Sequence, residues 1–511
     1  MNKHLIAGFD IGTSKIRCIL YDLRGNIKFI SSLKTPIIKK SDGYYYNPAE
    51  DLWNITKKVF KKCIKFSKQN RYEITSLAIS SVGESGIPID KNNKILLDAI
   101  PWYDQRTESI RDDFLKKINE RLIYKKTGLN SDHFFSAYKL LWIKANKPKV
   151  FNKIYKWLPI SDFIAWKFTN QIATDYSQAM RTMLLDPEKL KWSEFMCNKT
   201  NIDINLLPKL LPSGKKLGII NPKSKKEFNL LNDCVVGVGG HDHFVGTFAL
   251  GGFNNNIAVN SLGSAEAIII NTKKIIRTKE LNLNKFISGV FKTPNKTSNY
   301  IVGSILTSSL VIEWLKEILK VKDYKKLDKI LDNSEGVKKN IFIFPQFEFP
   351  HSPSKEKYSN GAIWGLALNS KSGDLYKSIL ECLSFDTKNA LFFILSHAKQ
   401  KIQKIICVGG GTKNSSWMQI RSNIFNRKIH INNNSENVSL GSAILAGIAS
   451  KSYKNEQDAF KIIINKEDVI INQIKDSSYY EKVFKEKYIP SIKIIKKLNN
   501  ILREKNNGII I

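Results

Sequence analysis

Acidic residues are scarce in this chain of 511 residues: 46 Asp and Glu stand against 81 Lys and Arg, a formal net charge of +35. The six cysteines are scattered and form no C-x-x-C pair, which argues against a structural zinc site and fits a reducing, cytoplasmic compartment. No apolar run approaches the length that spans a bilayer, and the first residues lack a signal-peptide layout. A Walker A loop, G-x-x-x-x-G-K-[ST], is not found at the first glycine turn.

The excess of positive charge is spread along the chain and is not gathered in one stripe with interleaved aromatic residues, as a nucleic-acid-binding face would require. Ile and Asn are abundant as well, so we interpret the lysines as a compositional bias expressed on solvated faces. Neither nucleic acid nor a membrane is therefore expected as a partner, and a homodimer stays open. The positive field would still favour a phosphorylated substrate or a nucleotide.

The length and the hydrophobic content of 42% indicate a globular protein with two or more domains. Its central motif is the stretch 235–246, in which a short apolar run is followed by two glycines and by Asp242 between two histidines. Ligands of open α/β sheets bind at such strand ends, where Asp242 can take a proton from a substrate hydroxyl. The alternative is that Asp242 only caps the following helix, and this stretch alone does not decide between the two.

Residues 5–34 predict a β-hairpin around a glycine turn, with a carboxylate, Asp10, at the end of its first strand. Backbone amides, two hydroxyls and an ammonium make this turn a candidate phosphate site, and Asp10 a candidate ligand of Mg²⁺, directly or through water. The alternative is ordinary hairpin chemistry. The phosphate-binding residues expected here are Gly12, Thr13, Ser14 and Lys15.

A second hairpin of this design is predicted at residues 257–270, with Gly263 and Ser264 as its phosphate-binding residues. Two such hairpins suggest two related domains, 1–250 and 251–511, with two phosphate clamps on either side of one cleft. A strand at 404–408 then opens into a third glycine turn and a helix at 417–425, a geometry suited to nucleotide binding. The nucleotide-binding residues expected there are Gly409, Gly410, Gly411 and Asn414.

The remaining patterns predict the surrounding elements. A strand is expected at 74–80, a polar connector at 197–233 and a loop at 342–353. The aromatic residues of the tail, Tyr480, Phe484 and Tyr488, follow helical spacing and are interpreted as core. Helices are predicted over 47–68, 137–146, 151–169, 308–320, 376–397, 441–450 and 478–504.

These motifs, in this order over roughly residues 5 to 490, resemble the FGGY family of carbohydrate kinases. The strongest likeness is the block Trp102-Tyr103-Asp104-Gln105-Arg106-Thr107, which is close to the family's W-x-D-x-R-T. The other blocks that resemble family motifs are Asp10–Ser14, Ile79–Ser85, Thr174–Ser177, Gly240–His243, Ser261–Ser264 and Gly409–Asn414 with Gln419. The resemblance implies an α/β fold of two related ribonuclease-H-like (actin-like ATPase) domains with a central cleft between them, and an ATP- and Mg²⁺-dependent sugar kinase.

The same resemblance implies roles for particular residues. Asp242 would be the catalytic base, and the substrate would contact Glu84, Trp102, Phe134 and His243. Xylulose kinases usually show Met-His where this chain has Glu84-Ser85, and Gly-Asp-Asn at 241–243. Glycerol kinases usually show Arg-Glu where it has Gly83-Glu84.

Glu84 and the imidazoles of His241 and His243 form a polar pocket that suits a polyhydroxylated sugar, and Asp242 needs a primary hydroxyl to deprotonate. An open-chain ketose presents both features, so we rank a ketose first as substrate, a polyol second and an aldonate third. A nucleotide- and sugar-binding relative without kinase activity, and a nucleic-acid binder, are the competing hypotheses.

Overall fold

Two sheets organise the chain in this computed structural model, which describes residues 4–41, 43–321, 329–331, 333–347, 351–354, 359–463 and 467–506. The strands of the first sheet are β1 (His4–Ile11), β2 (Lys15–Tyr21), β3 (Ile27–Lys34), β6 (Glu73–Ser81), β11 (Lys216–Ile219) and β12 (Val235–His241). Those of the second are β13 (Ile257–Leu262), β14 (Glu266–Thr272), β15 (Ile287–Lys292), β16 (Thr297–Ile305), β19 (Lys404–Val408), β20 (Ile429–Asn432) and β21 (Glu467–Ile470).

The two sheets repeat one topology. The first runs β3-β2-β1-β6-β12-β11, and the second runs β16-β14-β13-β19-β20-β21 with β15 added at its edge. In both, two antiparallel pairs are followed by two parallel pairs and a final antiparallel pair. The two hairpins predicted from the sequence are β1–β2 and β13–β14, at equivalent places, so the predicted pair of related α/β units is confirmed.

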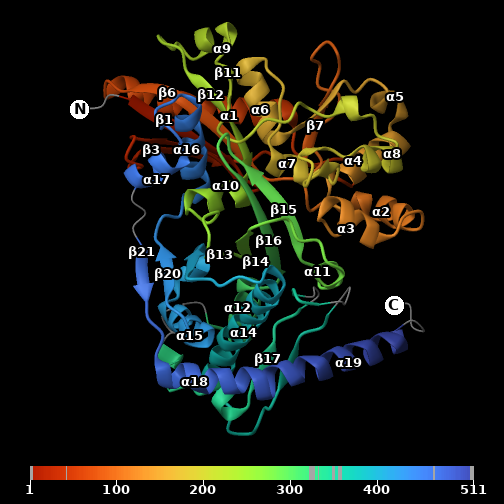
Figure 1. The fold of residues 1–511 in the computed structure, drawn as a ribbon, viewed down its shortest axis with the longest axis vertical. Coiled ribbons are helices and arrows are strands. Elements are labelled where there is room, and N and C mark those ends of the chain that lie inside the picture. The colour runs from red at the N-terminus through yellow and green to blue at the C-terminus, as the bar shows by residue number, and fades with distance from the viewer. Residues whose placement is uncertain are drawn as a thin grey trace.

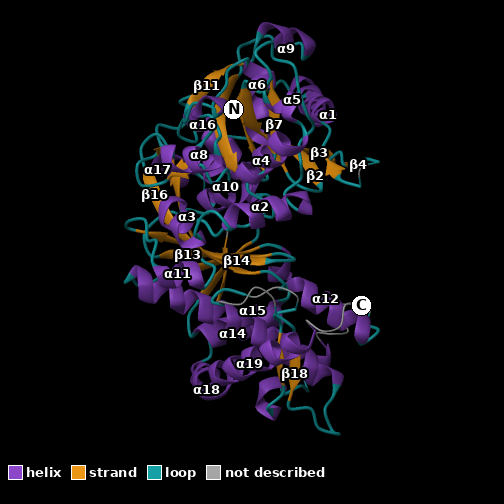
Figure 2. Cartoon of the chain, turned by 90° about the vertical axis from the view of Figure 1, so that its right-hand side faces the viewer, coloured by secondary structure: helices purple, strands orange, loops and turns teal. Residues whose placement is uncertain are grey.

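Helices surround the sheets in two lobes, one above the other in Figures 1 and 2. The helices of the first half are α1 (Ala49–Gln69), α2 (Glu108–Leu115), α3 (Glu120–Thr127), α4 (Ser136–Asn146), α5 (Pro148–Phe151), α6 (Ile160–Thr169), α7 (Tyr176–Met180), α8 (Glu194–Thr200), α9 (Pro222–Glu227) and α10 (Asp242–Ala249). Those of the second are α11 (Lys279–Leu283), α12 (Ser309–Ile318), α14 (Ser372–Ala398), α15 (Ser415–Phe425), α16 (Asn437–Ala449), α17 (Glu456–Ile462), α18 (Ile474–Val483) and α19 (Ile489–Asn506).

Helix α16 belongs to the second half of the chain but packs on the first sheet, beside β1 (Figure 1). Its small residues allow this: a Cβ added to Gly8 of β1 would lie 1.8 Å from the Ser439 carbonyl oxygen. On the other side, a Cβ on Gly441 would lie 2.3 Å from the Val245 carbonyl of α10. The helix predicted at 441–450 is therefore present as α16, and its close packing ties α10 to the first sheet.

Two local predictions are wrong. Residues 151–169 do not form one helix, because β8 (Lys156–Pro159) pairs with β7 (Gly86–Ile89) before α6 begins. The stretch predicted as a loop at 342–353 contains β17 (Phe342–Phe344), which pairs with β18 (Ala362–Trp364); its residues 348–350 lie outside the described part. The short pairs β4 (Ile38–Lys39) with β5 (Tyr45–Tyr46), and β9 (Leu185–Asp186) with β10 (Lys191–Trp192), complete the fold.

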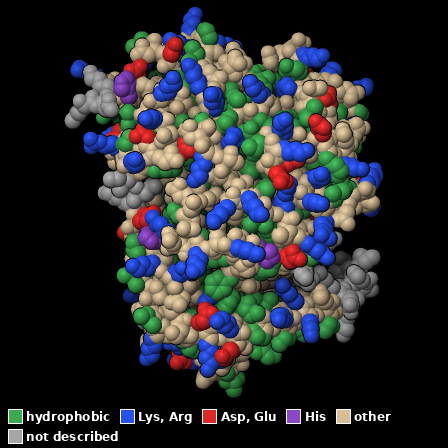
Figure 3. All heavy atoms as spheres, in the orientation of Figure 1, with side chains coloured by type: hydrophobic (Ala, Val, Ile, Leu, Met, Phe, Trp, Pro, Cys, Tyr) green, Lys and Arg blue, Asp and Glu red, His purple; other side chains and the backbone are tan. Residues whose placement is uncertain are grey.

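The tail follows its prediction. The side chains of Tyr480, Phe484 and Tyr488 are buried in the core of the second lobe. A π-helical turn over Phe484–Tyr488 joins α18 to α19 and keeps this aromatic row facing inward. None of the helices within the described residues combines the length and the apolar character needed to cross a membrane. On the face seen in Figure 3, Lys and Arg side chains are scattered over both lobes.

Candidate active site

Three neighbouring parallel strands deliver three carboxylates to one edge of the first sheet. Asp10 lies near the end of β1, Glu84 follows β6, and Asp242 follows β12. The strands approach closely there, since a Cβ on Gly239 of β12 would lie 1.7 Å from the Ile79 carbonyl oxygen of β6. A ligand of an open α/β sheet binds at such carboxyl ends, and this edge is therefore the candidate site.

Asp242 is the first residue of α10, and the residue before it, His241, is the cap: its Nδ1 accepts the His243 N–H at 3.2 Å. The Asp242 Oδ1 also accepts that N–H, at 2.7 Å. Burial raises the pKa of Asp242, and the Glu84 charge adds to this, while His243 and Arg181 oppose it. A carboxylate whose pKa is raised is a stronger base, which suits proton abstraction better than capping.

Asp10 is almost fully buried, and its Oδ2 accepts a hydrogen bond from the Arg17 Nη1 at 3.1 Å. Burial first, and then the charge of Asp242, raise the pKa of Asp10 to about 7, although Arg17 opposes the shift. Asp10, which is buried, and Asp242, which is partly buried, repel one another, and a divalent cation between them would relieve this repulsion. Mg²⁺ needs only one or two carboxylates, because it fills the rest of its shell with phosphate and water oxygens. The described residues contain no cluster of three or more metal-binding side chains.

Glu84 has a left-handed backbone, with φ of 62°, which turns its buried side chain toward Arg181. The Arg181 guanidinium forms an ion pair with Glu84 and lies over the rings of Phe134 and Phe135. The Glu84 carbonyl also accepts from the buried Lys139 Nζ, at 3.1 Å. Glu84 and Phe134 are therefore brought together through an arginine that the sequence reading did not single out; their contact with a substrate stays a prediction.

The other two predicted substrate residues lie at the margin of this arrangement. Trp102 is 42% exposed, and its indole N–H donates to the Thr13 hydroxyl at 3.1 Å. It therefore rests on the first hairpin, where it helps to line a small cavity with Gly12 and Thr13. His243 is exposed, and its ring lies 5.5 Å from that of His241.

Asp175 and Ser177 brace the end of β12, which carries Asp242. The buried Asp175 Oδ2 accepts from the Ser177 hydroxyl, and the Ser177 Oγ accepts the His241 backbone N–H at 2.9 Å. A Cβ on Gly240 would lie 2.8 Å from the Ser177 Oγ, so only glycine fits there. The block Thr174–Ser177 noted in the sequence therefore holds the site, and Arg181 follows one helical turn later at the end of α7.

The two hairpin turns have accessible tips. Thr13, Ser14 and Lys15 are exposed in the first, as is Ser264 in the second, and Gly12 and Gly263 are partly accessible. Beneath the second tip, Glu266 is buried and held by Arg421 in a bidentate ion pair, with Nη1–Oε1 of 2.6 Å and Nη2–Oε2 of 3.1 Å.

The third glycine turn lies against the second hairpin. Gly409 has φ of 100°, and a Cβ there would lie 2.3 Å from the Leu262 carbonyl oxygen, whereas a Cβ on Gly410 would meet no atom within 4 Å. Asn414 caps α15 by accepting the Trp417 N–H at 2.8 Å, and its amide donates to the Tyr376 hydroxyl. Gly410 is thus open to a ligand, whereas the Asn414 side chain is engaged within the protein.

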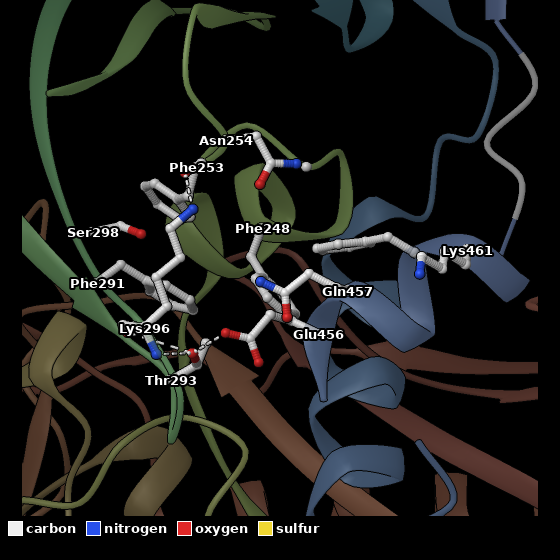
Figure 4. A pocket seen from close by; sticks show the side chains of 12 residues that line it. Phe248, Phe253, Asn254, Phe291, Thr293, Lys296, Ser298, Glu456, Gln457 and Lys461 are labelled. Atoms are coloured by element: carbon white, nitrogen blue, oxygen red, sulfur yellow. Dashed lines mark hydrogen bonds between the residues drawn. The ribbon is translucent and has the colours of Figure 1, made fainter. Parts of the chain in front are cut away.

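A separate cavity of about 270 Å³ lies at the other end of α10, away from Asp242. Four phenylalanines line it, together with Lys296, which donates to the Phe253 carbonyl at 2.8 Å, and Glu456 (Figure 4). None of the residues predicted for the sugar, phosphate or nucleotide sites lines this cavity. The lining phenylalanines are Phe248, Phe253, Phe291 and Phe460.

Sequence reasoning missed Arg181 and gave His241 no separate role. Arg181 lay four residues beyond a block that was noticed, and the N-cap Asp175 predicts that a short helix would carry it back toward β12. His241 was visible in the central motif, but its burial, its capping of α10 and its contact with Gly83, which distinguish it from the exposed His243, appear only in the structure.

Comparison with known proteins identifies the family to which the chain is similar. The N-terminal domain of the FGGY family of carbohydrate kinases matches residues 5–249, and the family's C-terminal domain matches residues 258–450. The chain is 28% identical to glycerol kinase 2 of Sulfolobus acidocaldarius (94% of this chain, 96% of the relative) and 23% identical to a xylulose kinase of Bacillus subtilis (94% and 95%).

Among solved structures, the glycerol kinase of Plasmodium falciparum with ADP superposes with a TM-score of 0.87 at 23% identity, covering 96% of this chain and 98% of that one. This likeness concerns the fold. Since the two family domains together span most of the sequence, the chain belongs to the FGGY family of carbohydrate kinases and is an ATP-dependent kinase.

Proposed function

We propose that this kinase transfers the γ-phosphoryl group of ATP to a primary hydroxyl of an open-chain ketose in the pentulose-to-hexulose range. The observation that carries the proposal is the convergence of Asp10, Glu84 and Asp242 at the ends of three adjacent parallel strands. Phosphoryl transfer is mostly positioning and electrostatic stabilisation, and these groups supply a base, a metal ligand and a substrate contact at one place.

Asp242 would accept the proton of the attacking hydroxyl, and its raised pKa supports that role. Mg²⁺, held by Asp10 directly or through water, would neutralise charge on the transferring phosphoryl group. The tips of the two hairpins would bind phosphate oxygens through their backbone amides and hydroxyls. The Gly409–Gly411 turn would receive the adenosine, with the open face of Gly410 toward it.

The charges around the site favour a neutral substrate over a sugar acid. Four carboxylates interact with one another there, and two arginines, Arg17 and Arg181, offset them. Arg181 is already paired with Glu84, so it is not a free partner for a substrate carboxylate. The carboxylates are those of Asp10, Glu84, Asp242 and Glu436.

A polyol such as glycerol is the second candidate, because the relative with 28% identity is named a glycerol kinase and Glu84 matches the Glu of the glycerol kinases' Arg-Glu. An aldonate is the third. An ADP-release assay of the purified chain against ketoses, polyols and sugar acids tests the ranking. A preference for glycerol or an aldonate, with ketoses inert, would contradict it and leave the kinase assignment intact.

The base is tested by Asp242→Asn. We expect kcat to fall by roughly 10²–10⁴-fold, with ATP and sugar affinities nearly unchanged, because the amide keeps the shape but cannot take the proton. Asp233→Asn, at an exposed carboxylate paired with Lys225, is the matched control and should leave kcat unchanged. An Asp242→Asn enzyme with near-native kcat would refute the assignment.

A further inference from the structure

The imidazole of His241 occupies space that exists only because residue 83 has no side chain. A Cβ added to Gly83 would lie 2.3 Å from the His241 Cδ2 and 2.7 Å from its Nε2. The same Cβ would lie 2.9 Å from the Cγ of Arg181. Gly83 directly precedes Glu84, so the ring of His241 stands beside the Glu84–Arg181 pair.

The two ring nitrogens of His241 are in different situations. Nδ1 is engaged at the start of α10, 3.2 Å from the His243 backbone nitrogen and 3.1 Å from the Asp242 Oδ1. Nε2 has no hydrogen-bond partner within the described residues, although the residue is only 6% exposed. Since none of these residues supplies a partner for this nitrogen, a ligand can pair with it.

An imidazole nitrogen pairs well with a hydroxyl, because a hydroxyl can both donate and accept a hydrogen bond. Arg181, the cation beside the ring, is already paired with Glu84, so a hydroxyl fits this place better than a carboxylate.

We propose that the His241 Nε2 hydrogen-bonds a hydroxyl of the sugar and helps the kinase to select neutral polyhydroxylated substrates. This inference rests on the proposed function, in which the next residue, Asp242, takes the proton of the attacked hydroxyl. Gly83 then affects specificity indirectly, because its lack of a side chain leaves the space that the imidazole of His241 fills.

A pair of substitutions separates this role from capping. Asn is a preferred N-cap, so His241→Asn keeps the cap of α10 but has no atom at the Nε2 position. His241→Gln can place an amide near Nε2 but lacks the Nδ1 cap. We expect His241→Asn to raise the sugar KM roughly 5- to 100-fold, the loss from one hydrogen bond to a buried group, while the ATP KM and the Tm stay native. His241→Gln should recover part of the sugar KM and lower the Tm.

Gly83→Ala gives an independent test, because its methyl group must displace the ring. It should raise the sugar KM in the native background and add little in the His241→Asn background, where the ring is already gone. A native sugar KM for His241→Asn, or equal effects of Gly83→Ala in both backgrounds, would overturn the inference while leaving the kinase assignment standing. A wild-type chain that phosphorylates no ketose, polyol or sugar acid would overturn the proposed function, and this inference with it.

Discussion

The two glycine hairpins share a topology but treat their buried charge in opposite ways. In the first, Asp10 has one arginine partner, which is itself about one-third exposed, and its pKa is raised to about 7. In the second, Glu266 accepts from Arg421, Thr387, Ser308 and Asn260. Burial alone would raise the pKa of Glu266, but the Arg421 charge and these hydrogen bonds lower it.

Within one repeated motif, this difference distinguishes a carboxylate with a structural role from one that is available to bind a ligand. A fully neutralised carboxylate, such as Glu266, has nothing left to bind and serves to hold β14 against α14 and α15. A buried carboxylate with a raised pKa is unfavourable for the apoprotein and is expected where a cation or a proton is to be received. This contrast supports the proposal that the first hairpin takes part in the chemistry and the second in binding the nucleotide.

The largest effect should come from breaking the Glu266–Arg421 pair. Arg421→Met leaves a buried carboxylate without its cation, and we expect the free energy of unfolding to fall by about 3–5 kcal/mol in urea titrations. Arg17→Met, at the Asp10–Arg17 pair of the first hairpin, should cost at most about 1 kcal/mol, because that arginine is partly exposed. The double variant Glu266→Leu/Arg421→Met should regain most of the loss. Equal losses of unfolding free energy for Arg421→Met and Arg17→Met would contradict the contrast between the two hairpins.

Asp10→Asn should give the opposite result, with activity lost and stability kept. The amide removes the charge that repels Asp242, so in metal-free buffer the Tm should be no lower than in the wild type. The rate with Mg²⁺ and ATP should fall by roughly 10²–10³-fold, as for other losses of preorganised charge stabilisation. Measuring kcat/KM as a function of magnesium concentration checks whether the lost metal ligand is the cause. A variant with the wild-type magnesium dependence would refute the metal role of Asp10.

The contrast could be predicted only in part from the sequence. Both hairpins, their glycine turns and the strand before Asp242 follow from local patterns of apolar and small residues, and the structure confirms them. The sequence could not show that Glu266 is neutralised, because its partner Arg421 lies 155 residues away in the chain. Asp10 lies before its glycine turn and pairs with Arg17 of the same hairpin, whereas Glu266 lies after its turn and pairs with an arginine from a distant helix.

Long-range pairing also explains the other features that were not predicted from the sequence. Residues 156–159 sit in a stretch with helical composition, yet they form a strand because β7 offers an edge some 70 residues earlier in the chain. The Gly83–His241 fit joins two motifs that are far apart in sequence. Each motif departs from the usual family pattern at that position, but the sequence gives no means of connecting the two departures.

The protonation of Glu266 should contribute to the fall in the free energy of unfolding at acidic pH. Its folded-state pKa lies below the ordinary 4.5, so its contribution is present above that value and is lost as the pH falls through the lowered pKa. Wild-type stability should therefore fall more steeply below pH 4.5 than that of Glu266→Leu/Arg421→Met, by on the order of 1 kcal/mol per pH unit. If the free energy of unfolding fell equally steeply with pH in the two proteins, the Glu266–Arg421 pair would not govern the pH dependence.

The smallest effect concerns the glycine turn that rests on the second hairpin. Gly410 has an open Cβ direction and no positive φ, so Ala, Val and Phe should be accommodated there without loss of Tm. If the adenosine lies over this turn, nucleotide affinity measured by calorimetry should fall with side-chain size, by roughly 10-fold for Val, while sugar affinity stays native. Gly409→Ala provides the contrast: its φ of 100° and the Leu262 carbonyl 2.3 Å from the added Cβ should lower stability whether or not nucleotide is present. Nucleotide affinity that is independent of the side chain at 410 would move the adenosine away from this turn.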